Sequence, residues 1–379
     1  IQLGSYNMEA RNDAYFWRGE SYYRMGEYEN AISDYRTYLN NTRQRNTDMY
    51  ALAYYNLGYS YFKLRDYSAA LNRFRQYVAY NRIGDCLYQN RQFSLAEENY
   101  SRAVQLSPSA GDYSIYQKGF LLGLQKDYKG KISAMDRLIS EYPESQYVDD
   151  ALFEKGRSYV LLENSSSAAQ AFEKLIREFP QSSLARKAGI QLGLLYYNDN
   201  QPEKALAAYK QVISNYPGSE EAKIALQDLK SVYIDLNDIN AYASYVNSIG
   251  GNIRLEVGEQ DSLTYIAAEK LFMRGDNDGA RRSLINYLQT FPEGAFSSNA
   301  NFYLGSIAFA KKEFDEAIQR FKSVIASGDT KFLEESVART AEIEYLSKDY
   351  PAALESFKRL LIVAENPENR QAARLGIMR

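Results

Sequence analysis

A small residue followed twelve positions later by an alanine recurs along this chain and constrains its fold. The pairs are Gly19/Ala31, Gly58/Ala70, Gly84/Ala96, Gly156/Ala168, Gly193/Ala205, Ala268/Ala280, Gly305/Ala317 and Ala341/Ala353. Two further sites depart from the pattern, because Gly119/Lys131 retains only the glycine and Lys230/Tyr242 retains neither small residue. Successive first members are mostly 35 to 39 residues apart. A fixed period of this length is typical of solenoids built from helix–turn–helix units.

Close packing explains the twelve-residue spacing. It joins the middle of one helix to the middle of the next across a short turn, where only glycine or alanine lets two backbones approach closely. Large apolar residues stand four and seven positions beyond the alanine, as in Phe74 and Tyr77 or Phe172 and Leu175. This pattern places them on one face of a helix. Each unit is therefore predicted to be a pair of amphipathic helices.

The repeated pattern resembles the tetratricopeptide repeat, whose motif runs W/L-x2-L-G-x2-Y and then A, F, A and P. Residues 81–109 carry Gly84, Ala96, Tyr100, Ala103 and Pro108 at the matching positions, and residues 48–80 carry Leu57, Gly58, Tyr61, Ala70 and Phe74. The resemblance covers nearly the whole chain. It implies an all-α fold, a right-handed solenoid superhelix of about ten repeats, and a binding protein rather than a catalyst.

Ten repeats and a partial eleventh are predicted. They span roughly 10–46, 48–80, 81–109, 111–145, 146–182, 183–219, 220–250, 261–295, 296–330 and 331–366. The glycine-bearing connection 248–259 follows the seventh repeat, in which Lys230 and Tyr242 have replaced the small pair. A bulky pair should splay its two helices, so we expect a change of direction there. The predicted domains are 1–250, with repeats one to seven, and 251–379, with the remaining repeats.

Four boundaries between repeats share an aromatic residue, a proline and, in three of them, a serine. They are Tyr142-Pro143-Glu144-Ser145, Phe179-Pro180-Gln181-Ser182, Tyr216-Pro217-Gly218-Ser219 and Phe291-Pro292-Glu293-Gly294. Proline ends one helix and serine can cap the next. This boundary resembles the exported repeat proteins of Gram-negative bacteria, such as outer-membrane assembly lipoproteins and the Tol-Pal coordinator. The resemblance implies a periplasmic or outer-membrane location. Alternatively, the motif is only a favourable turn between repeats and says nothing about location. The alternative location is cytoplasmic.

Composition argues against most chemistry. The chain has no histidine and one cysteine, Cys86, which excludes Ser-His and Cys-His nucleophiles and histidine-containing metal sites. No glycine motif for phosphate or dinucleotide binding is present. We therefore expect no catalytic residue, no metal and no cofactor. A net charge of −3 argues against a nucleic-acid partner. The sequence also contains no run of about 18 apolar residues, which is the length needed to cross a membrane, so we expect no direct membrane insertion.

Two features suggest that the sequence is incomplete. The chain starts at Ile1-Gln2 within an expected helix and ends in the segment that contains Ala372-Ala373-Arg374-Leu375-Gly376, which resembles a first helix without its partner. We expect a fragment of a longer array. In addition, Gly58 and Gly84 are only 26 residues apart, which leaves no room for a turn before repeat three. The interpretations are residues missing between Tyr80 and Asn81, one fused helix, or a genuine deletion.

The candidate binding residues are aromatic. In the resembled family the first helices of the repeats line a concave groove, and the exposed positions lie three before the packing residue and one and four after it. In the first four repeats the aromatic residues at these positions are Phe16, Tyr23, Tyr55, Tyr59, Phe62, Tyr88, Tyr116 and Phe120. Tyrosine offers a broad apolar face and one hydrogen-bonding tip, which suits a binding surface. The alternative is that these rings fill the space between neighbouring helices.

These observations favour a non-catalytic scaffold that binds a peptide or protein partner in a bacterial envelope assembly. The alternatives are a structural spacer or self-assembling subunit, which makes a homo-oligomer possible, and a glycan-binding module that stacks the same tyrosines on sugars. The family's peptide-carboxylate clamp uses lysine and asparagine at groove positions. Here those positions hold Phe16, Glu20, Tyr55 and Tyr59, so that clamp is not expected.

Overall fold

The computed structural model describes residues 8–43, 45, 47–77, 79–250, 254–328 and 331–379. The regular secondary structure of these residues consists of α-helices and one short 3-10 turn at Pro108–Ala110, with no strand. It divides into two compact units, Ile1–Leu195 and Tyr196–Arg379. The predicted all-α class is confirmed, and the handedness of the superhelix stays a prediction.

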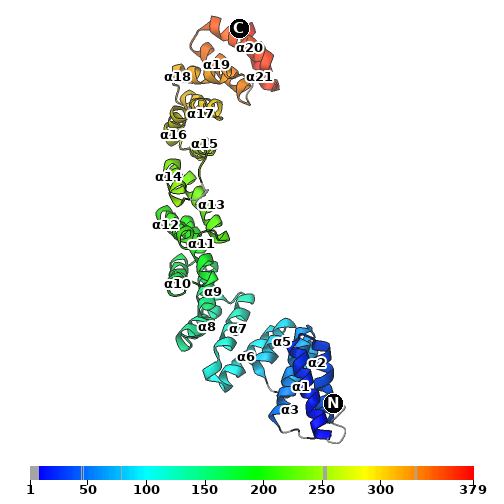
Figure 1. The fold of residues 1–379 in the computed structure, drawn as a ribbon. Coiled ribbons are helices and arrows are strands. Elements are labelled where there is room, and N and C mark those ends of the chain that lie inside the picture. Colours follow the sequence, from blue (N-terminus) through cyan, green and yellow to red (C-terminus); the bar gives the residue numbers. More distant parts are fainter. Residues whose placement is uncertain (1–7, 44, 46, 78, 251–253, 329–330) are drawn as a thin grey trace. The chain divides into compact units, whose positions relative to one another are not determined.

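The first unit contains five consecutive helix pairs (Figure 1). Its helices are α1 Met8–Arg24, α2 Tyr28–Asn41, α3 Asp48–Lys63, α4 Tyr67–Tyr77, α5 Tyr80–Gln89, α6 Phe93–Leu106, α7 Asp112–Leu124, α8 Tyr128–Glu141, α9 Val148–Leu161 and α10 Ser165–Glu178. Helix α11 (Ser183–Asn198) spans the division between the units.

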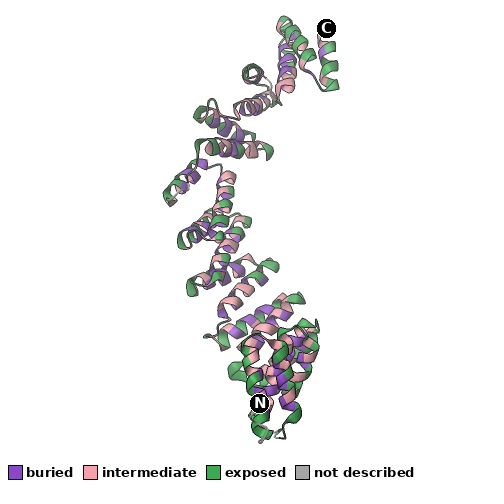
Figure 2. Ribbon diagram, turned by 45° about the vertical axis from the view of Figure 1, so that its right-hand side comes forward, coloured by how far each residue is buried: buried purple, intermediate pink, exposed green. Residues whose placement is uncertain are grey.

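The second unit continues the alternation of first and second helices. Its helices are α12 Pro202–Asn215, α13 Glu220–Asp235, α14 Ile239–Ile249, α15 Val257–Met273, α16 Asn277–Thr290, α17 Ser297–Ala310, α18 Phe314–Ala326, α19 Leu333–Leu346, α20 Tyr350–Val363 and α21 Pro367–Met378. Buried residues recur along the successive helices of both units (Figure 2). The described helices thus form ten pairs followed by α21, as the sequence predicts for ten repeats and a partial eleventh.

A left-handed residue ends the first helix of every pair. The residue seven positions after the first packing residue has a positive φ in all ten repeats: Gly26, Arg65, Arg91, Lys126, Glu163, Asn200, Asn237, Gly275, Lys312 and Lys348. At Arg91, for example, φ is 59° and the next amide, Gln92 N, donates to Leu87 O over 2.8 Å. This backbone reversal closes the last turn of a helix. Only two of the ten positions hold glycine, so the sequence signal for this turn was weak.

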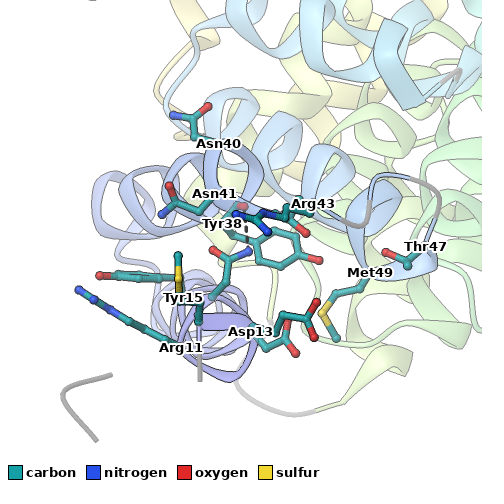
Figure 3. A pocket seen from close by; sticks show the side chains of 13 residues that line it. Arg11, Asp13, Tyr15, Tyr38, Asn40, Asn41, Arg43, Thr47 and Met49 are labelled. Carbon is teal, nitrogen blue, oxygen red and sulfur yellow. Dashed lines mark hydrogen bonds between the residues drawn. The ribbon is translucent and has the colours of Figure 1, made fainter. Parts of the chain in front are cut away.

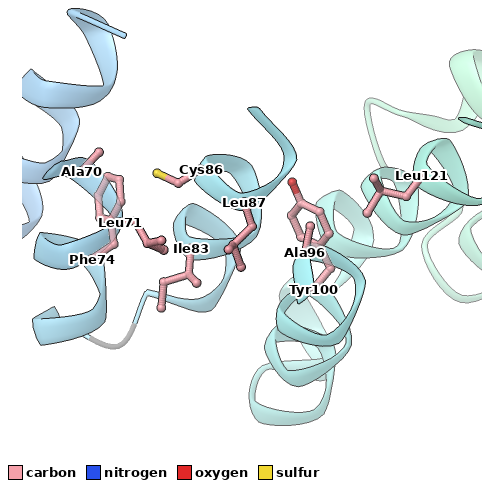
Figure 4. Close-up of a cluster of buried hydrophobic side chains, with 9 residues drawn as sticks. All are labelled: Ala70, Leu71, Phe74, Ile83, Cys86, Leu87, Ala96, Tyr100 and Leu121. Atoms are coloured by element: carbon pink, nitrogen blue, oxygen red, sulfur yellow. The ribbon is translucent and has the colours of Figure 1, made fainter. Parts of the chain in front are cut away.

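The small packing residue makes room for a ring rather than for a backbone. A Cβ added to Gly58 would lie 2.8 Å from the Phe74 ring, and one added to Gly84 would lie 2.7 Å from the Tyr100 ring. At Gly19, Gly58, Gly84, Gly156 and Gly305 the ring stands sixteen residues after the glycine, four beyond the paired alanine. Phe74 and Tyr100 flank α5 in the hydrophobic cluster of repeats two and three (Figure 4). The sequence predicted a close approach here, but assigned it to the two helix backbones.

The two departures from the pairing are accommodated differently. In repeat four the ring is replaced by the flexible Met135 side chain, which contacts Gly119, and the buried Lys131 forms an ion pair with Glu154 of α9. In repeat seven Lys230 forms an ion pair with Glu259 of α15 over 3.0 Å, while Tyr242 is buried. The predicted domain boundary at about 250 lies within the second unit and stays a prediction; residues 251–253 lie outside the described range.

The short spacing between Gly58 and Gly84 is absorbed by shorter helices. Helix α4 has 11 residues and α5 has 10. Helix α4 ends at Tyr77 and α5 begins at Tyr80. Ala79 N donates to Phe74 O over 3.1 Å and Ala79 O accepts from Ile83 N over 2.9 Å. The predicted fused helix is therefore wrong, because Ala79, directly before α5, has non-helical dihedral angles (φ −86°, ψ 79°). That residues are missing from the sequence at Tyr80-Asn81 stays a prediction.

The serines at the proline boundaries do not all cap helices. Ser219 Oγ accepts from Ala222 N over 3.1 Å at the start of α13, and Ser182 Oγ accepts from Leu184 N over 3.1 Å. Both bonds agree with the predicted capping role. Ser145 Oγ likewise accepts from Tyr147 N over 3.2 Å, but this amide lies before α9, which begins at Val148. Ser145 also donates to Asp112 of α7 over 2.6 Å, as Ser182 does to Asp149 of α9 over 2.7 Å, so both serines link successive first helices.

Candidate protein-binding surface

The predicted binding residues lie on the first helices of the first four repeats. Phe16 and Tyr23 belong to α1, Tyr55, Tyr59 and Phe62 to α3, Tyr88 to α5, and Tyr116 and Phe120 to α7. Phe16 is only 1% exposed and contacts the rings of Tyr35 and Tyr38. It is a core residue and not the exposed groove residue that the sequence suggested, because its helix turns this position toward α2. The other seven are partly exposed.

The three aromatic residues of α3 pack into one group. The ring centroids of Tyr55 and Tyr59 are 4.9 Å apart, and those of Tyr59 and Phe62 are 6.5 Å apart. Tyr55 and Tyr59 also lie 5.8 and 5.4 Å from Phe74 of α4. One side of each tyrosine therefore covers the core ring that fills the space at Gly58, while the rest of the side chain remains accessible.

Arg82 of α5 connects three successive first helices. Its guanidinium lies 5.7 Å from the ring of Tyr59 of α3 and 4.9 Å from the ring of Tyr113 of α7. Such cation–π contacts each stabilise by about 0.5–2 kcal/mol. Arg82 Nη1 also lies 2.5 Å from Asp85 Oδ2. The sequence reasoning missed Arg82, because it stands two residues before Gly84, outside the three groove positions considered for each repeat.

Asp85 is the buried acceptor of this arrangement. Its Oδ1 accepts from the hydroxyls of Tyr100 and Tyr113, each over 2.7 Å. Burial raises the pKa of the Asp85 carboxyl, although Arg82 and the two tyrosine hydroxyls favour its ionised form. Burial and the neighbouring carboxylate in turn raise the pKa of both hydroxyls. The network therefore fixes the geometry of α5 against α6 and α7.

Aromatic side chains are also in contact between α5 and α7. Tyr88 and Phe120 have centroids 6.3 Å apart, and the Lys131 ammonium lies 5.9 Å from the Phe120 ring. Tyr116 stacks on Tyr147 at 5.1 Å, and burial raises the pKa of its hydroxyl. We call Tyr55, Tyr59, Phe62, Tyr88, Tyr116 and Phe120, with Arg82, the aromatic surface. Tyr23 lies beside it on α1 and contacts Tyr28 at 5.7 Å.

Outside this surface, we considered the single cysteine, groups of possible metal ligands and long apolar helices among the described residues. Cys86 is buried, and burial raises its pKa to about 12, so its thiol is not activated. In the described part of the chain, no three His, Cys, Asp or Glu residues are grouped to hold a metal ion. Among the same residues, no helix has the length and apolarity needed to cross a membrane.

These features define a class of protein, the helical-repeat proteins. Each repeat is one pair of helices, and a left-handed residue lies in the turn that joins the two helices. Models of the tetratricopeptide repeat match residues 55–111 and 267–330, and a second model of the same repeat matches 13–41 and 113–145. The chain therefore contains tetratricopeptide repeats at these residues. A model of the outer membrane lipoprotein YfiO matches residues 149–232.

Solved structures of several repeat proteins resemble the chain. PilF of Pseudomonas aeruginosa is 18% identical, with a TM-score of 0.42 over 58% of this chain and 99% of that chain. YrrB, described as a TPR protein with an unusual peptide-binding site, is 23% identical, with a TM-score of 0.39 over 49% of this chain and 95% of that chain. A tetratricopeptide repeat protein from Parabacteroides merdae is 15% identical, with a TM-score of 0.35 over 87% of this chain and 98% of that chain. No curated protein matches the chain.

Proposed function

We propose that this protein is a non-catalytic scaffold that binds a peptide or protein partner through the aromatic surface of its first unit. Tetratricopeptide repeats generally mediate protein–protein interaction, and the family match supports that level of the proposal. The proposal that the partner binds on the aromatic surface rests on the partly exposed aromatic residues of α3, α5 and α7. Arg82 contacts the rings of Tyr59 and Tyr113, and Tyr88 contacts Phe120. Tyrosine, phenylalanine and arginine are enriched at protein interfaces, and tyrosine and arginine are frequent anchors there.

The fixed position of these side chains favours binding. Tyr59 is held between Phe74 and the Arg82 guanidinium, and Tyr116 is held on Tyr147. A partner that docks on rings already held in place loses less conformational entropy than one that must order them. Arg82 gives the surface a cationic component, which Asp85 partly neutralises, while the charge of the buried Lys131 is paired with Glu154. We therefore expect a partner with apolar anchors and little net charge.

We further propose that the assembly belongs to the bacterial envelope, at the periplasm or the outer membrane. The match of residues 149–232 to an outer membrane lipoprotein model supports this location. Fractionation of the native host, followed by immunodetection of the chain, tests it. Recovery in the cytoplasmic fraction would contradict the location but leave the binding proposal intact.

Selection from a displayed peptide library tests the binding proposal. The wild-type chain is the bait, and selected peptides are rescreened against the chain bearing Tyr55→Ala and Tyr59→Ala. Hydroxyl-radical footprinting with and without the best peptide then reports which tyrosines become protected. Protection centred on Tyr55, Tyr59 and Tyr88 is expected. Protection elsewhere would refute the site, and self-association in analytical ultracentrifugation without peptide binding would favour a self-assembling subunit.

A further inference from the structure

A polar pocket lies at the start of the first unit, away from the aromatic surface. Its volume is about 630 Å³, and it lies between the first turns of α1, the end of α2 and the start of α3 (Figure 3). Its walls include Asn12, Tyr38, Arg43 and Met49. A pocket of this size accommodates a small polar molecule.

Asn12 contributes an acceptor that has no partner. Its side chain is 7% exposed, and its Nδ2 donates to the main-chain oxygen of Tyr38 over 3.2 Å. This bond fixes the orientation of the amide, because the reverse orientation would place two oxygen atoms against each other. Asn12 Oδ1 is buried and has no hydrogen-bond partner. A buried acceptor left unpaired is unfavourable, so the pocket favours a molecule that donates a hydrogen bond at this point.

The pocket presents donors and acceptors with balanced charge. Arg11 and Arg43 are matched in number by Glu9 and Asp13. In Figure 3, Asn41 and Arg43 lie on one side of Tyr38 and Asp13 lies on the other. A ligand that fits both sides donates toward Asp13 and Asn12 Oδ1 and accepts from the arginine and amide groups. It does not need a net charge of its own.

We propose that this pocket binds a neutral saccharide. A hydroxyl group both donates and accepts, so it reproduces the hydrogen bonds of the water that it displaces, which an apolar ligand cannot do. The Tyr15 ring and the Met49 side chain supply apolar contact for the C–H face of a sugar ring. The site is separate from the aromatic surface and binds a different class of ligand, so it stands or falls independently of the proposed function.

Saturation-transfer difference NMR tests the proposal on the intact chain. The probes are maltose, cellobiose and N,N′-diacetylchitobiose, with a uronic-acid disaccharide as the charged comparison. Transfer to at least one neutral probe, with little to the uronate, is expected. No transfer to any neutral probe, or transfer to the uronate alone, would overturn the proposal.

Two variants locate the binding. Asn12→Leu removes the unpaired acceptor and should weaken binding by about tenfold, and Arg43→Ala, an exposed change that leaves the helices intact, should weaken it several-fold. Asn99→Leu on α6 is the matched control, since Asn99 Nδ2 likewise donates to a main-chain oxygen, that of Leu95, over 2.7 Å. The control and the change of Tyr55 and Tyr59 to alanine should leave saccharide binding unchanged. Undiminished binding in both pocket variants would refute the site, and loss only in the tyrosine variant would place the sugar on the aromatic surface.

Discussion

The Phe74 ring occupies the space into which a side chain on Gly58 would extend. A Cβ at Gly58 would lie 2.8 Å from Cε1 and 2.9 Å from Cδ1 of that ring, and Phe74 is fully buried. The same relationship joins Gly84 to Tyr100, Gly156 to Phe172 and Gly305 to Phe321. Alanine replaces glycine in two repeats: sixteen positions after Ala268 stands the smaller Leu284, whereas sixteen positions after Ala341 stands Phe357. In the four repeats of Gly58, Gly84, Gly156 and Gly305, an aromatic ring of the second helix therefore fills the space that glycine leaves on the first helix.

We expect any side chain at Gly58 to destabilise the first unit. Gly58→Ala should lower the free energy of unfolding by about 1 kcal/mol and Gly58→Leu by about 3 kcal/mol, because overpacking forces the ring or the backbone to move. Damage should stay near α3 and α4, since repeats contact mainly their neighbours. Urea denaturation measures the loss, and hydrogen exchange measures its extent along the chain.

A second change and a matched control separate overpacking from other effects. In the double variant Gly58→Ala with Phe74→Leu, the smaller side chain should accommodate the added methyl, so the two effects should not add. Gly258→Ala in α15 is the control, because nothing lies within 4 Å of its added Cβ. It should stabilise by about 0.5–1 kcal/mol. Additive losses in the double variant would show that ring and glycine do not interact.

Glycine at a left-handed turn position should stabilise the protein. Arg65 has a φ of 64° and Lys312 a φ of 62°, a conformation that costs a residue with a Cβ about 1 kcal/mol. Arg65→Gly and Lys312→Gly should each raise the free energy of unfolding by about 0.5–1 kcal/mol. Arg75→Gly, at an exposed helical position of α4, should instead lower it by about 1 kcal/mol. Equal losses at all three positions would argue against the left-handed turns.

The second unit should lose stability in acid through Asp235. Burial alone would raise the pKa of this carboxyl, but hydrogen bonds from Lys270 and Tyr197 and the charge of Arg274 lower it below its ordinary value of 3.8. The unfolded carboxyl thus binds a proton more readily than the folded one, so this contribution is present above pH 3.8 and is lost as the pH falls through the folded pKa. Asp235→Asn should cost about 1–2 kcal/mol at pH 7 and flatten the acid dependence. The exposed Asp315→Asn should do neither, and thermal melts from pH 2 to 7 test both.

The aromatic surface should carry the affinity for a selected peptide. Tyr55→Ala with Tyr59→Ala should weaken binding by at least about tenfold, since the loss of one such anchor often costs roughly 2 kcal/mol. The same variant should also melt earlier, because both rings cover Phe74. Phe302→Ala with Phe309→Ala, in the second unit, is the matched control and should leave peptide affinity nearly unchanged.

The change of both tyrosines to phenylalanine separates binding from packing. It keeps the rings and removes the hydroxyl groups, so the melting temperature should be retained while any hydrogen bond to the peptide is lost. If the alanine variant unfolds early yet binds normally below its melting temperature, the tyrosines are packing residues and the binding site lies elsewhere.

The repeat period, the helix pairs and the family were determined by the sequence, because small residues and apolar stripes recur at spacings that one helix pair imposes on its own residues. Tertiary structure decided what lies next to each small residue: Phe74 at Gly58, and Met135 at Gly119. It also decided that Phe16 is buried and that Arg82 joins Tyr59 to Tyr113. These outcomes depend on the direction in which neighbouring helices present their side chains. The period of a single chain segment does not contain that information, since contacts between repeats form only once the helices have packed.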